Sequence, residues 1–476
     1  MPSPQDHQVL AGFLDSEAQR PLLGLLYGRR RIGKSTLLVE HTDQREGFYF
    51  EATRVQTPAQ LDRLGAALGQ HLGVGRIALD TWEEAIAQLL ALGEAGPIPV
   101  VIDEFGHILE ADRSVDSVLA SAFGPGARRQ GGSRARMVLC GSAIAVMRAL
   151  TAGEAPLRGR AGMELVMQPD DFRTAAGRLD CHDLVLATRV YAVIGGVVGY
   201  ATDMTNFDLP ASTGDFDRWV AERVLSPASP LHDEATTLLA EDPTLAGPSN
   251  LLHHSILGAI ANGSVTAGHI ANRIGRQVSN LAPALNRLVD AGFVVRHADP
   301  LRQQRPLYAL SDPYLQFHYA ILERHRTALR ARDQRQVWRD QLVVTYDSQV
   351  RGPVFEEQAR TWVRRFADPA TVGGPPDEVG PSAVSVGGSE HELDVVVAAS
   401  GPVPSQREVL AMGEAKAGQT VTCDHLRRLE QARTALGPRA ATAKLLLFGT
   451  SFADDLRHLG RADIELIDLD RLYAGT

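Results

Sequence analysis

The chain has 476 residues, a length that predicts about three domains at roughly 150 residues each. Hydrophobic residues make up 44% and charged residues 22%, as in globular proteins, and no apolar run approaches the roughly 20 residues of a membrane span. Neither a basic start nor an apolar stretch with a cleavage site opens the chain, so we expect a cytoplasmic protein without membrane contact. Three widely spaced cysteines argue against a disulfide framework or a zinc site.

Charge is distributed unevenly along the chain. The 48 basic and 57 acidic residues give a net charge of −9, yet twelve arginines face only six acidic residues between positions 270 and 340. Sign asymmetry of this kind indicates an anionic partner for that stretch. Only three basic residues are lysine, Lys34, Lys416 and Lys444. Where arginine has replaced nearly every lysine, a retained lysine indicates a need for a compact, rotatable ammonium group.

Short apolar runs alternate with amphipathic segments in the first predicted domain, residues 1–168. The runs PLLGLLYG, FYFEATR, PVVIDEFG and RMVLCGS are predicted strands. Between them, LDRLGAALGQHLG and TWEEAIAQLLALG repeat apolar residues every three or four positions, as helices do. This alternation is typical of a parallel α/β sheet.

A phosphate-binding loop is predicted at GRRRIGKST, which follows the first strand and precedes a helix. Its glycines let the backbone turn so that N–H groups and the helix N-terminus face phosphate oxygens, while Lys34 reaches the β and γ phosphates and Ser35 holds Mg²⁺. The expected ligand is therefore ATP with Mg²⁺. The predicted nucleotide-binding residues are Gly28, Arg29, Arg30, Arg31, Ile32, Gly33, Lys34, Ser35, Thr36 and, from a later strand, Ser142.

Polar side chains at the ends of later strands complete the predicted nucleotide site. Asp103 is expected to act on the Mg²⁺ shell, and Glu104 to polarise the attacking water. Ser142, after MVLCG, either senses the γ phosphate or merely ends a strand. Arg158 and Arg160 in APLRGRAG are candidates for contacting the γ phosphate, in cis or from a neighbouring subunit of a homo-oligomer.

The rest of the chain divides into four predicted parts. Residues 169–248 are mainly helical, with a break at Gly195-Gly196, and residues 249–313 give three short helices followed by a hairpin, the order of a winged helix. A helical connector covers residues 314–350. A smaller α/β domain, residues 351–476, contains the predicted strands HELDVVVAA, REVLAMGEAK and KLLLFGTS after a Pro/Gly-rich loop at Gly373–Gly388.

The predicted winged helix offers a polar face that suits DNA. The helix–turn–helix in VTAGHIANRIGRQVSNLAPALNRLVDAGFVVR would bury its leucines and expose side chains that reach phosphates or base edges: Gln277, Ser279, Asn280, Asn286 and Arg287. Arg302 and Arg305 fall in the expected wing. DNA is therefore an expected partner, and the alternative is a winged helix that serves only as an interdomain lever.

The C-terminal domain carries two acids and a lysine on neighbouring predicted strands. Asp394 lies on the first, and Glu414 and Lys416 lie two apart on the next, so they share one face. The two acids are predicted to bind a divalent metal ion, and Lys416 to orient or help deprotonate a water that attacks a phosphodiester. For a carboxylate on the preceding helix, Glu357 is preferred to Glu356. The pattern resembles the restriction-endonuclease-like superfamily, whose members include active nucleases and inactive binding modules.

Several motifs together resemble the archaeal-type P-loop ATPase family, of the AAA and STAND class: YGRRRIGKSTLL, VVIDEF, LCGS, APLRGRAG, VIGGVVGY and LSDPYLQFHY. This family combines an ATPase core with a winged helix and often ends in a nuclease-like domain, so the resemblance covers most of the chain. Two departures stand out. The family's phenylalanine-rich G-R-x-x-E box is missing before the phosphate-binding loop, which leaves adenine contacts unassigned, and Gln316 and His318 replace the usual aromatic residue and arginine.

Taken together, the sequence predicts an α/β multidomain protein with a P-loop sheet, a helical and winged-helix middle, and a restriction-endonuclease-like end. The expected function is a Mg²⁺-dependent ATPase whose nucleotide cycle controls a nuclease-like domain that acts on or binds DNA. The alternatives are a slow nucleotide switch with an inactive C-terminal domain, and a DNA-binding regulator. Catalysis is assigned to Lys34, Asp103, Glu104, Arg158, Arg160, Asp394, Glu414 and Lys416, and metal binding to Ser35, Asp103, Glu357, Asp394 and Glu414.

Overall fold

The computed structural model describes residues 2–126, 132–302, 306–401 and 403–476 and divides the chain into two compact units. Arg305, which the sequence assigns to the wing, lies outside these residues. The first unit comprises Met1–Pro169, Leu238–Ala246 and Asp290–Gly292, and the second comprises Asp170–Thr237, Gly247–Val289 and Phe293–Thr476.

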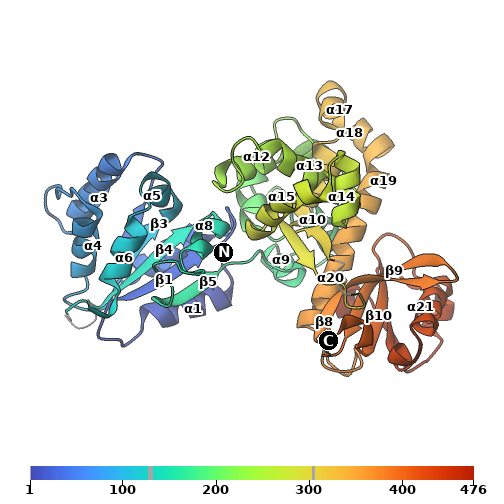
Figure 1. Cartoon of the computed structure of the whole chain (residues 1–476). Coiled ribbons are helices and arrows are strands. Elements are labelled where there is room, and N and C mark those ends of the chain that lie inside the picture. The colour runs from blue at the N-terminus through green and yellow to red at the C-terminus, as the bar shows by residue number, and fades with distance from the viewer. Residues whose placement is uncertain (1, 127–131, 303–305, 402) are drawn as a thin grey trace. The chain divides into compact units, whose positions relative to one another are not determined.

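A five-stranded parallel sheet forms the centre of the first unit, in the order β2-β3-β4-β1-β5 (Figure 1). The expected parallel α/β sheet is thereby confirmed, and the four predicted strands form β1 to β4. The strands are β1 (Leu22–Tyr27), β2 (Phe48–Glu51), β3 (Ile98–Asp103), β4 (Ala135–Gly141) and β5 (Ala161–Val166). β5 is an edge strand with half-exposed residues, so its sequence AGMELV lacks the continuous apolar run of a strand buried on both faces.

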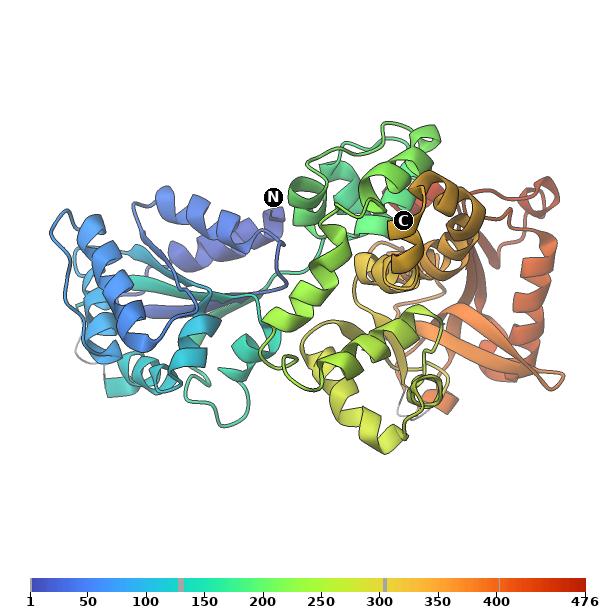
Figure 2. The same ribbon diagram turned by 90° about the horizontal axis from the view of Figure 1, so that it is seen from above.

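Helices cover both faces of this sheet (Figure 2). On one face α1 (Pro4–Leu14) and α2 (Lys34–Asp43) pack on the strands, and their leucines share an apolar core with Val101 and Val138. The other face carries α3 (Thr57–His71), α4 (Trp82–Ala91), α5 (Phe105–Ala111), α6 (Val115–Ala122) and α8 (Ile144–Ala149). Burial on both faces fixes each central strand, and hence the positions of the loops at its carboxyl end.

The second unit begins with helices and continues with three helices and an antiparallel pair of strands. The first group is α9 (Phe172–Arg178), α10 (Leu184–Ile194), α11 (Phe216–Trp219) and α12 (Leu231–Glu241), whose residues from Leu238 onward count with the first unit. The second group, in the order predicted for residues 249–313, is α13 (Asn250–Ala261), α14 (Ala267–Ile274), α15 (Val278–Asp290), β6 (Val294–His297) and β7 (Leu307–Leu310). Gly275, at a φ of 67°, ends α14 in the left-handed conformation that the turn before α15 requires.

Two of the motifs that carry the family resemblance lie against each other in this unit. A Cβ built on Gly195 would lie 2.6 Å from the Asp312 carboxylate, so only glycine allows this approach of VIGGVVGY to LSDPYLQFHY. The rings of Tyr200 and Tyr314 are 4.7 Å apart. Gln316 donates its amide to the Ala261 carbonyl at 2.8 Å, so the residue that departs from the family pattern ties two helices together.

A chain of short helices connects this part to the C-terminal region (residues 351–476). It contains α16 (Pro313–Phe317), α17 (Arg326–Ala331), α18 (Gln334–Val337) and α19 (Val343–Tyr346), with π-helical turns at His318–Leu322, Trp338–Leu342 and Asp347–Arg351. The last turn leads directly into α20 (Gly352–Arg365). Helical structure over the predicted connector therefore runs on into the C-terminal region.

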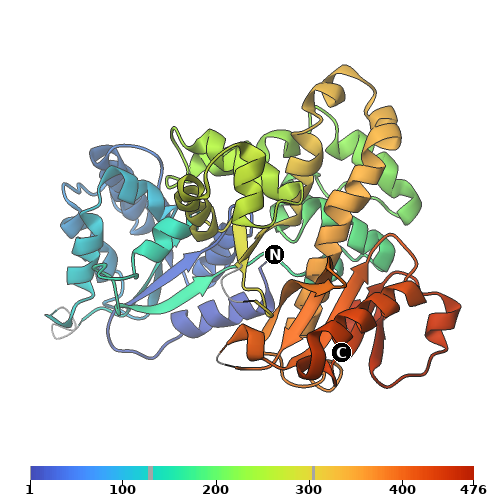
Figure 3. The same cartoon turned by 45° about the vertical axis from the view of Figure 1, so that its right-hand side comes forward.

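A mixed five-stranded sheet forms the C-terminal region, in the order β12-β11-β10-β9-β8 (Figure 3). Its strands are β8 (Glu378–Val386), β9 (Ser389–Ala398), β10 (Val409–Lys416), β11 (Lys444–Gly449) and β12 (Ile464–Ile467). α20 packs on one face and α21 (Cys423–Leu436) on the other, while α22 (Asp454–Arg457) and α23 (Leu469–Ala474) complete the region. Strands β8, β9 and β10 pair antiparallel, whereas β10, β11 and β12 pair parallel, so β10 belongs to both sets.

The prediction of a loop over Gly373–Gly388 is wrong for residues 378–386, because these residues form strand β8. Its sequence EVGPSAVSV contains residues that disfavour strands. Pairing with β9 along nearly its whole length, together with burial of alternate residues, outweighs that local preference. Among the described residues, no helix has both the length and the apolar character needed to cross a membrane.

Candidate functional site

The phosphate-binding loop joins β1 to α2 in the first unit. Gly33, at a φ of 98°, caps α2 in the left-handed region, and a Cβ on Gly28 would lie 2.5 Å from the Met167 carbonyl oxygen. Both positions therefore require glycine. Lys34 is 5% exposed, and its ammonium donates to the carbonyls of Gly28 and Arg29, each at 2.9 Å. The lysine thus holds the loop around its own side chain, where N–H groups at the start of α2 can face an anion.

Asp103 ends β3 and is nearly fully buried beside this loop. It accepts hydrogen bonds from the hydroxyls of Ser35 and Tyr49, each at 2.7 Å. Burial raises the pKa of Asp103. The hydrogen bonds from Cys140, Tyr49, Ser35 and the N–H of Glu104 together lower this pKa by more than burial raises it, so the net pKa lies below the usual range. The carboxylate therefore stays ionised beside the Ser35 hydroxyl.

Glu104 and Ser142 meet at the carboxyl edge of the sheet. β4 lies between β1 and β3, so Ser142, one residue past its end, stands between the loop and the two acids. The Ser142 hydroxyl donates to the Glu104 carboxylate at 3.0 Å. Glu104 has a φ of 49°, which is unusual for a residue other than glycine, and strained backbone of this kind occurs at functional sites.

Arg158 and Arg160 lie at the opposite end of the sheet, where the parallel strands begin. They precede β5, whose first residue pairs near the start of β1, whereas the phosphate-binding loop follows the end of β1. The two ends are about 16 Å apart at roughly 3.3 Å per residue. Arg158 donates to the Gly153 carbonyl at 2.7 Å and Arg160 to that of Pro156 at 2.9 Å. This position argues against a contact with a γ phosphate in cis, and a contact from a neighbouring subunit stays a prediction.

The side chains present suit a nucleotide with Mg²⁺. Ser35 and Asp103 offer a hydroxyl and an ionised carboxylate, the hard oxygen ligands that Mg²⁺ prefers. Gly28 through Thr36 contribute the loop and the first turn of α2, as expected for a phosphate cradle. Arg29 is buried, and Arg30 and Arg31 are half-buried.

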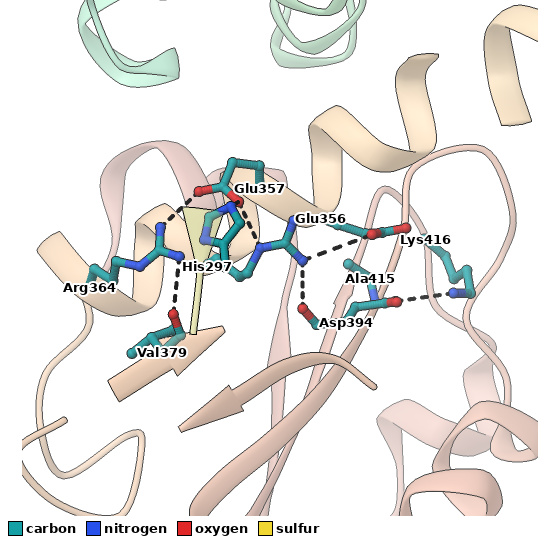
Figure 4. Close-up of polar contacts among 9 residues, drawn as sticks. His297, Glu356, Glu357, Arg364, Val379, Asp394, Ala415 and Lys416 are labelled. Carbon is teal, nitrogen blue, oxygen red and sulfur yellow. Dashed lines mark hydrogen bonds and ion pairs between the residues drawn. The ribbon is translucent and has the colours of Figure 1, made fainter. Parts of the chain in front are cut away.

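In the C-terminal region, Lys416 contacts two carboxylates from adjacent strands, and Figure 4 shows the one from Asp394. Its ammonium lies 3.3 Å from Asp394 and 3.1 Å from Glu414. Asp394 also accepts the N–H of Ala415 at 2.8 Å, and Arg428 of α21 lies 3.5 Å from Glu414. Burial lowers the pKa of Lys416, but the two carboxylates raise it above its usual value. In this arrangement the Lys416 ammonium can orient an anion or a water beside the two carboxylates.

The two glutamates of α20 share Arg360 but differ in their other neighbours (Figure 4). Glu356 lies on the side of Asp394, and burial and this carboxylate raise its pKa well above the usual range. Glu357 instead accepts from Arg364 at 2.8 Å and lies 3.9 Å from His297. The structure therefore brings Glu356, and not the preferred Glu357, to the Asp394 carboxylate.

The donor set for a metal ion in this region is small. In the part of the chain that the structure describes, no three His, Cys, Asp or Glu side chains are grouped as a metal site requires. Asp394 and Glu414 do converge on one point, since both contact the Lys416 ammonium. Two carboxylates suit Mg²⁺, which keeps several waters and takes other oxygens from a phosphate substrate.

Some residues of both sites do not follow from the sequence motifs. Tyr49 and Cys140 reach Asp103 only because β2 and β4 flank β3, and strand order has no local signal. Arg360, which binds both α20 glutamates, lies four and three residues after them, and this helical spacing is a signal for an ion pair. Arg428 belongs to a helix on the far side of β10, so only the tertiary structure reveals it.

Comparison with known proteins finds relatives in archaea. No family model matches the chain. It is 23% identical over 305 residues to an uncharacterised protein of Methanocaldococcus jannaschii, so it spans 63% of the length of that relative, with 63% of this chain matched. Among solved structures, the Walker-type ATPase of Pyrococcus abyssi aligns with a TM-score of 0.50 and 20% identity over 67% of this chain and 95% of that one. The ORC2 protein of Aeropyrum pernix gives a TM-score of 0.40, 17% identity, and coverage of 68% and 93%. The likeness to the Pyrococcus ATPase shows that the two chains share the P-loop α/β fold.

Proposed function

We propose that the protein is a Mg²⁺-dependent ATPase. The observation that carries the proposal is the pairing of Ser35 with the ionised Asp103 at 2.7 Å, beside a glycine-shaped loop that holds Lys34. Bound Mg²⁺ would neutralise charge on the phosphate oxygens. Lys34 and the N–H groups at the start of α2 bind the phosphates, and Glu104 accepts a proton from the water that attacks the γ phosphorus, so that ADP and phosphate leave.

Substitutions that separate binding from hydrolysis test this proposal. Lys34→Ala should abolish ATP binding, measured by titration with a fluorescent ATP analogue. Glu104→Gln should keep binding but lower hydrolysis at least about 100-fold, because a positioned base contributes that much. Glu110→Gln serves as the matched control, since this acid also follows β3 but pairs with Arg54 on the surface. Full hydrolysis by Lys34→Ala would overturn the assignment.

The C-terminal region is proposed to be a nuclease-like domain that acts on or binds DNA under control of the nucleotide cycle. Its support is the order of α20, β8, β9, β10, α21 and β11 with Asp394, Glu414 and Lys416 on adjacent strands. The matching division of the chain is residues 1–168, 169–248, 249–313, 314–350 and 351–476, with a winged helix as the third part. The exposed polar side of α14 and α15 supports DNA as the partner.

A second candidate function is a nucleotide switch or DNA-binding regulator whose C-terminal region recognises nucleic acid without cutting it. The charge balance favours it, because Lys416 and Arg428 already pair with the two carboxylates. Incubation of plasmid and single-stranded DNA with Mg²⁺ or Mn²⁺, with and without ATP, separates the two. Cleavage that is lost in Asp394→Ala and Lys416→Ala supports the nuclease, and binding without cleavage supports the switch.

A further inference from the structure

The loop after β6 leaves the three-helix segment and enters the C-terminal region. We infer that residues 297–302, hereafter the clamp loop, fasten the segment of residues 250–310 to the C-terminal sheet as one rigid body. DNA bound on the exposed side of α15 is then held at a fixed distance from Lys416. The second statement rests on the proposed DNA binding, whereas the first rests on the contacts of the clamp loop alone.

The first contact is apolar. Leu301 is 4% exposed and lies in the same buried cluster as Val384 of β8 and Leu393 of β9. A side chain of the hairpin connection thus forms part of the core of the C-terminal sheet. Because removal of apolar surface from water is the main stabilising force in folding, separation of the two parts would expose this core.

The second contact is polar and buried. The Ser382 hydroxyl donates to the Asp299 carboxylate at 2.6 Å, and Asp299 also accepts the N–H of Leu301 at 3.0 Å. Both Asp299 and Ser382 are buried. A buried carboxylate must keep its hydrogen-bond donors, so this pair fixes the register of the loop on β8, which an apolar contact alone would leave free to slide.

An ion pair at one end of the clamp loop and a histidine contact at the other complete its attachment. At one end, Arg302 lies 2.9 Å from Glu390 of β9. At the other, His297 lies 3.9 Å from Glu357 of α20, and Glu357 is itself held by Arg360 and Arg364. Arg302, which the sequence assigns to a DNA-binding wing, is therefore used on the C-terminal sheet.

The C-terminal sheet is shaped to receive this loop. A Cβ built on Gly380 would lie 3.0 Å from the Ala298 carbonyl oxygen and 3.3 Å from Pro300. The β8–β9 register shifts between Gly380 and Ser382, at the position where the loop crosses. A glycine and a strand irregularity at the same contact indicate a built-in joint between the two parts.

Spin labels measure the rigidity of this joint without DNA. One label goes on α14 (Asn272→Cys) and one on α21 (Arg427→Cys), both exposed, with the partly exposed native thiols replaced by serine (Cys181→Ser, Cys423→Ser). We expect one narrow distance distribution in the full chain. In the clamp variant, Leu301→Ala with Asp299→Ala, the distribution should become at least twice as wide. Val295→Ala, at an exposed position of β6, is the matched control and should leave the distribution unchanged.

Either of two results overturns the rigid joint: a broad distribution in the parent protein, or a distribution equally narrow in the clamp variant. Circular dichroism of each variant shows whether it remains folded. If Leu301→Ala with Asp299→Ala unfolds, Ser382→Ala, which removes only the buried hydroxyl, replaces it.

A tethered cleavage reagent then tests the fixed distance on DNA. An iron chelate on residue 427 cuts nearby DNA chemically, whatever the protein's own activity, and the probe is a GC-rich linear duplex of defined sequence. We expect cuts confined to one window at a constant distance from the centre of the hydroxyl-radical footprint, and scattered cuts in the clamp variant. Scattered cuts with a sharp footprint in the parent would contradict the inference. Absence of any footprint would contradict the DNA proposal, while the spin labels still decide the joint.

Discussion

Arg360 connects the backbone of Asp394 to both glutamates of α20. Its guanidinium donates to the Asp394 carbonyl at 2.7 Å and to the Glu357 carboxylate at 2.7 Å, and lies 3.9 Å from Glu356. The Arg360 side chain is 6% exposed. A buried cation with several acceptors holds the helix and the strand in one arrangement. Arg360 is thus a positioning residue for the carboxylates of the C-terminal region.

Replacing Arg360 should destabilise the C-terminal region. Arg360→Met leaves the Asp394 carbonyl and Glu357 without a buried partner, at an expected cost of about 3 kcal/mol, the lower end for a broken buried pair because Glu357 is 40% exposed. Urea unfolding followed by tryptophan fluorescence measures this cost, because one of the four tryptophans, Trp362 of α20, is packed in the core of the C-terminal sheet. Arg364→Met is the control, with an expected loss below about 1 kcal/mol for a partly exposed pair. Equal losses would contradict the positioning role.

Two glycines of the first unit should respond to alanine in opposite ways. At Gly28 a methyl group would collide with the Met167 carbonyl, so Gly28→Ala should lower the melting temperature and impair ATP binding. At Gly12, inside α1, a Cβ would meet nothing within 4 Å, so Gly12→Ala should stabilise the protein by about 0.5 to 1 kcal/mol. Thermal unfolding compares the pair. A neutral Gly28→Ala would show that the loop can shift.

Arg158 and Arg160 should affect ATP hydrolysis only through a neighbouring subunit. Arg158→Ala and Arg160→Ala should leave the rate of ATP hydrolysis per chain unchanged at dilutions where ultracentrifugation shows monomers. Both side chains lie where the parallel strands begin, at the end of the sheet opposite the phosphate-binding loop. If the protein assembles at higher concentration, the rate of the parent should rise and that of the variants should not. A loss of activity in dilute monomer would contradict this geometry.

Acid should weaken the C-terminal region through Asp463. Hydrogen bonds from Arg461, which have the largest effect, and from Arg433 lower the pKa of Asp463. Burial raises this pKa by less, so the pKa stays well below its usual value of about 3.9. A depressed folded-state pKa adds stability that is complete above the unfolded-state value and is lost as the pH falls towards the folded-state value. The urea midpoint should therefore drop below pH 4. In Asp463→Asn it should be lower at pH 7 and change less below pH 4, and an identical pH profile would contradict the assignment.

Local patterns in the sequence determine the first unit and the residues of its proposed nucleotide site. The central strands β1, β3 and β4 are buried on both faces, so each is a nearly continuous apolar run, and GRRRIGKST carries its glycines and lysine within nine positions. Neighbours in sequence are sufficient here, because a single loop and the start of one helix provide the phosphate cradle.

The tertiary structure alone decides what depends on the order and the direction of elements. The position of β4 between β1 and β3 brings Ser142 to Glu104. The parallel pairing of β5 with β1 places Arg158 and Arg160 at the end of the sheet opposite the phosphate-binding loop. One step along α20, about 100° around the helix, separates Glu356 beside Asp394 from Glu357 beside His297. Hydrophobic periodicity specifies which residues are buried in an element, but not which neighbour buries them, and that choice is made only when distant segments pack together.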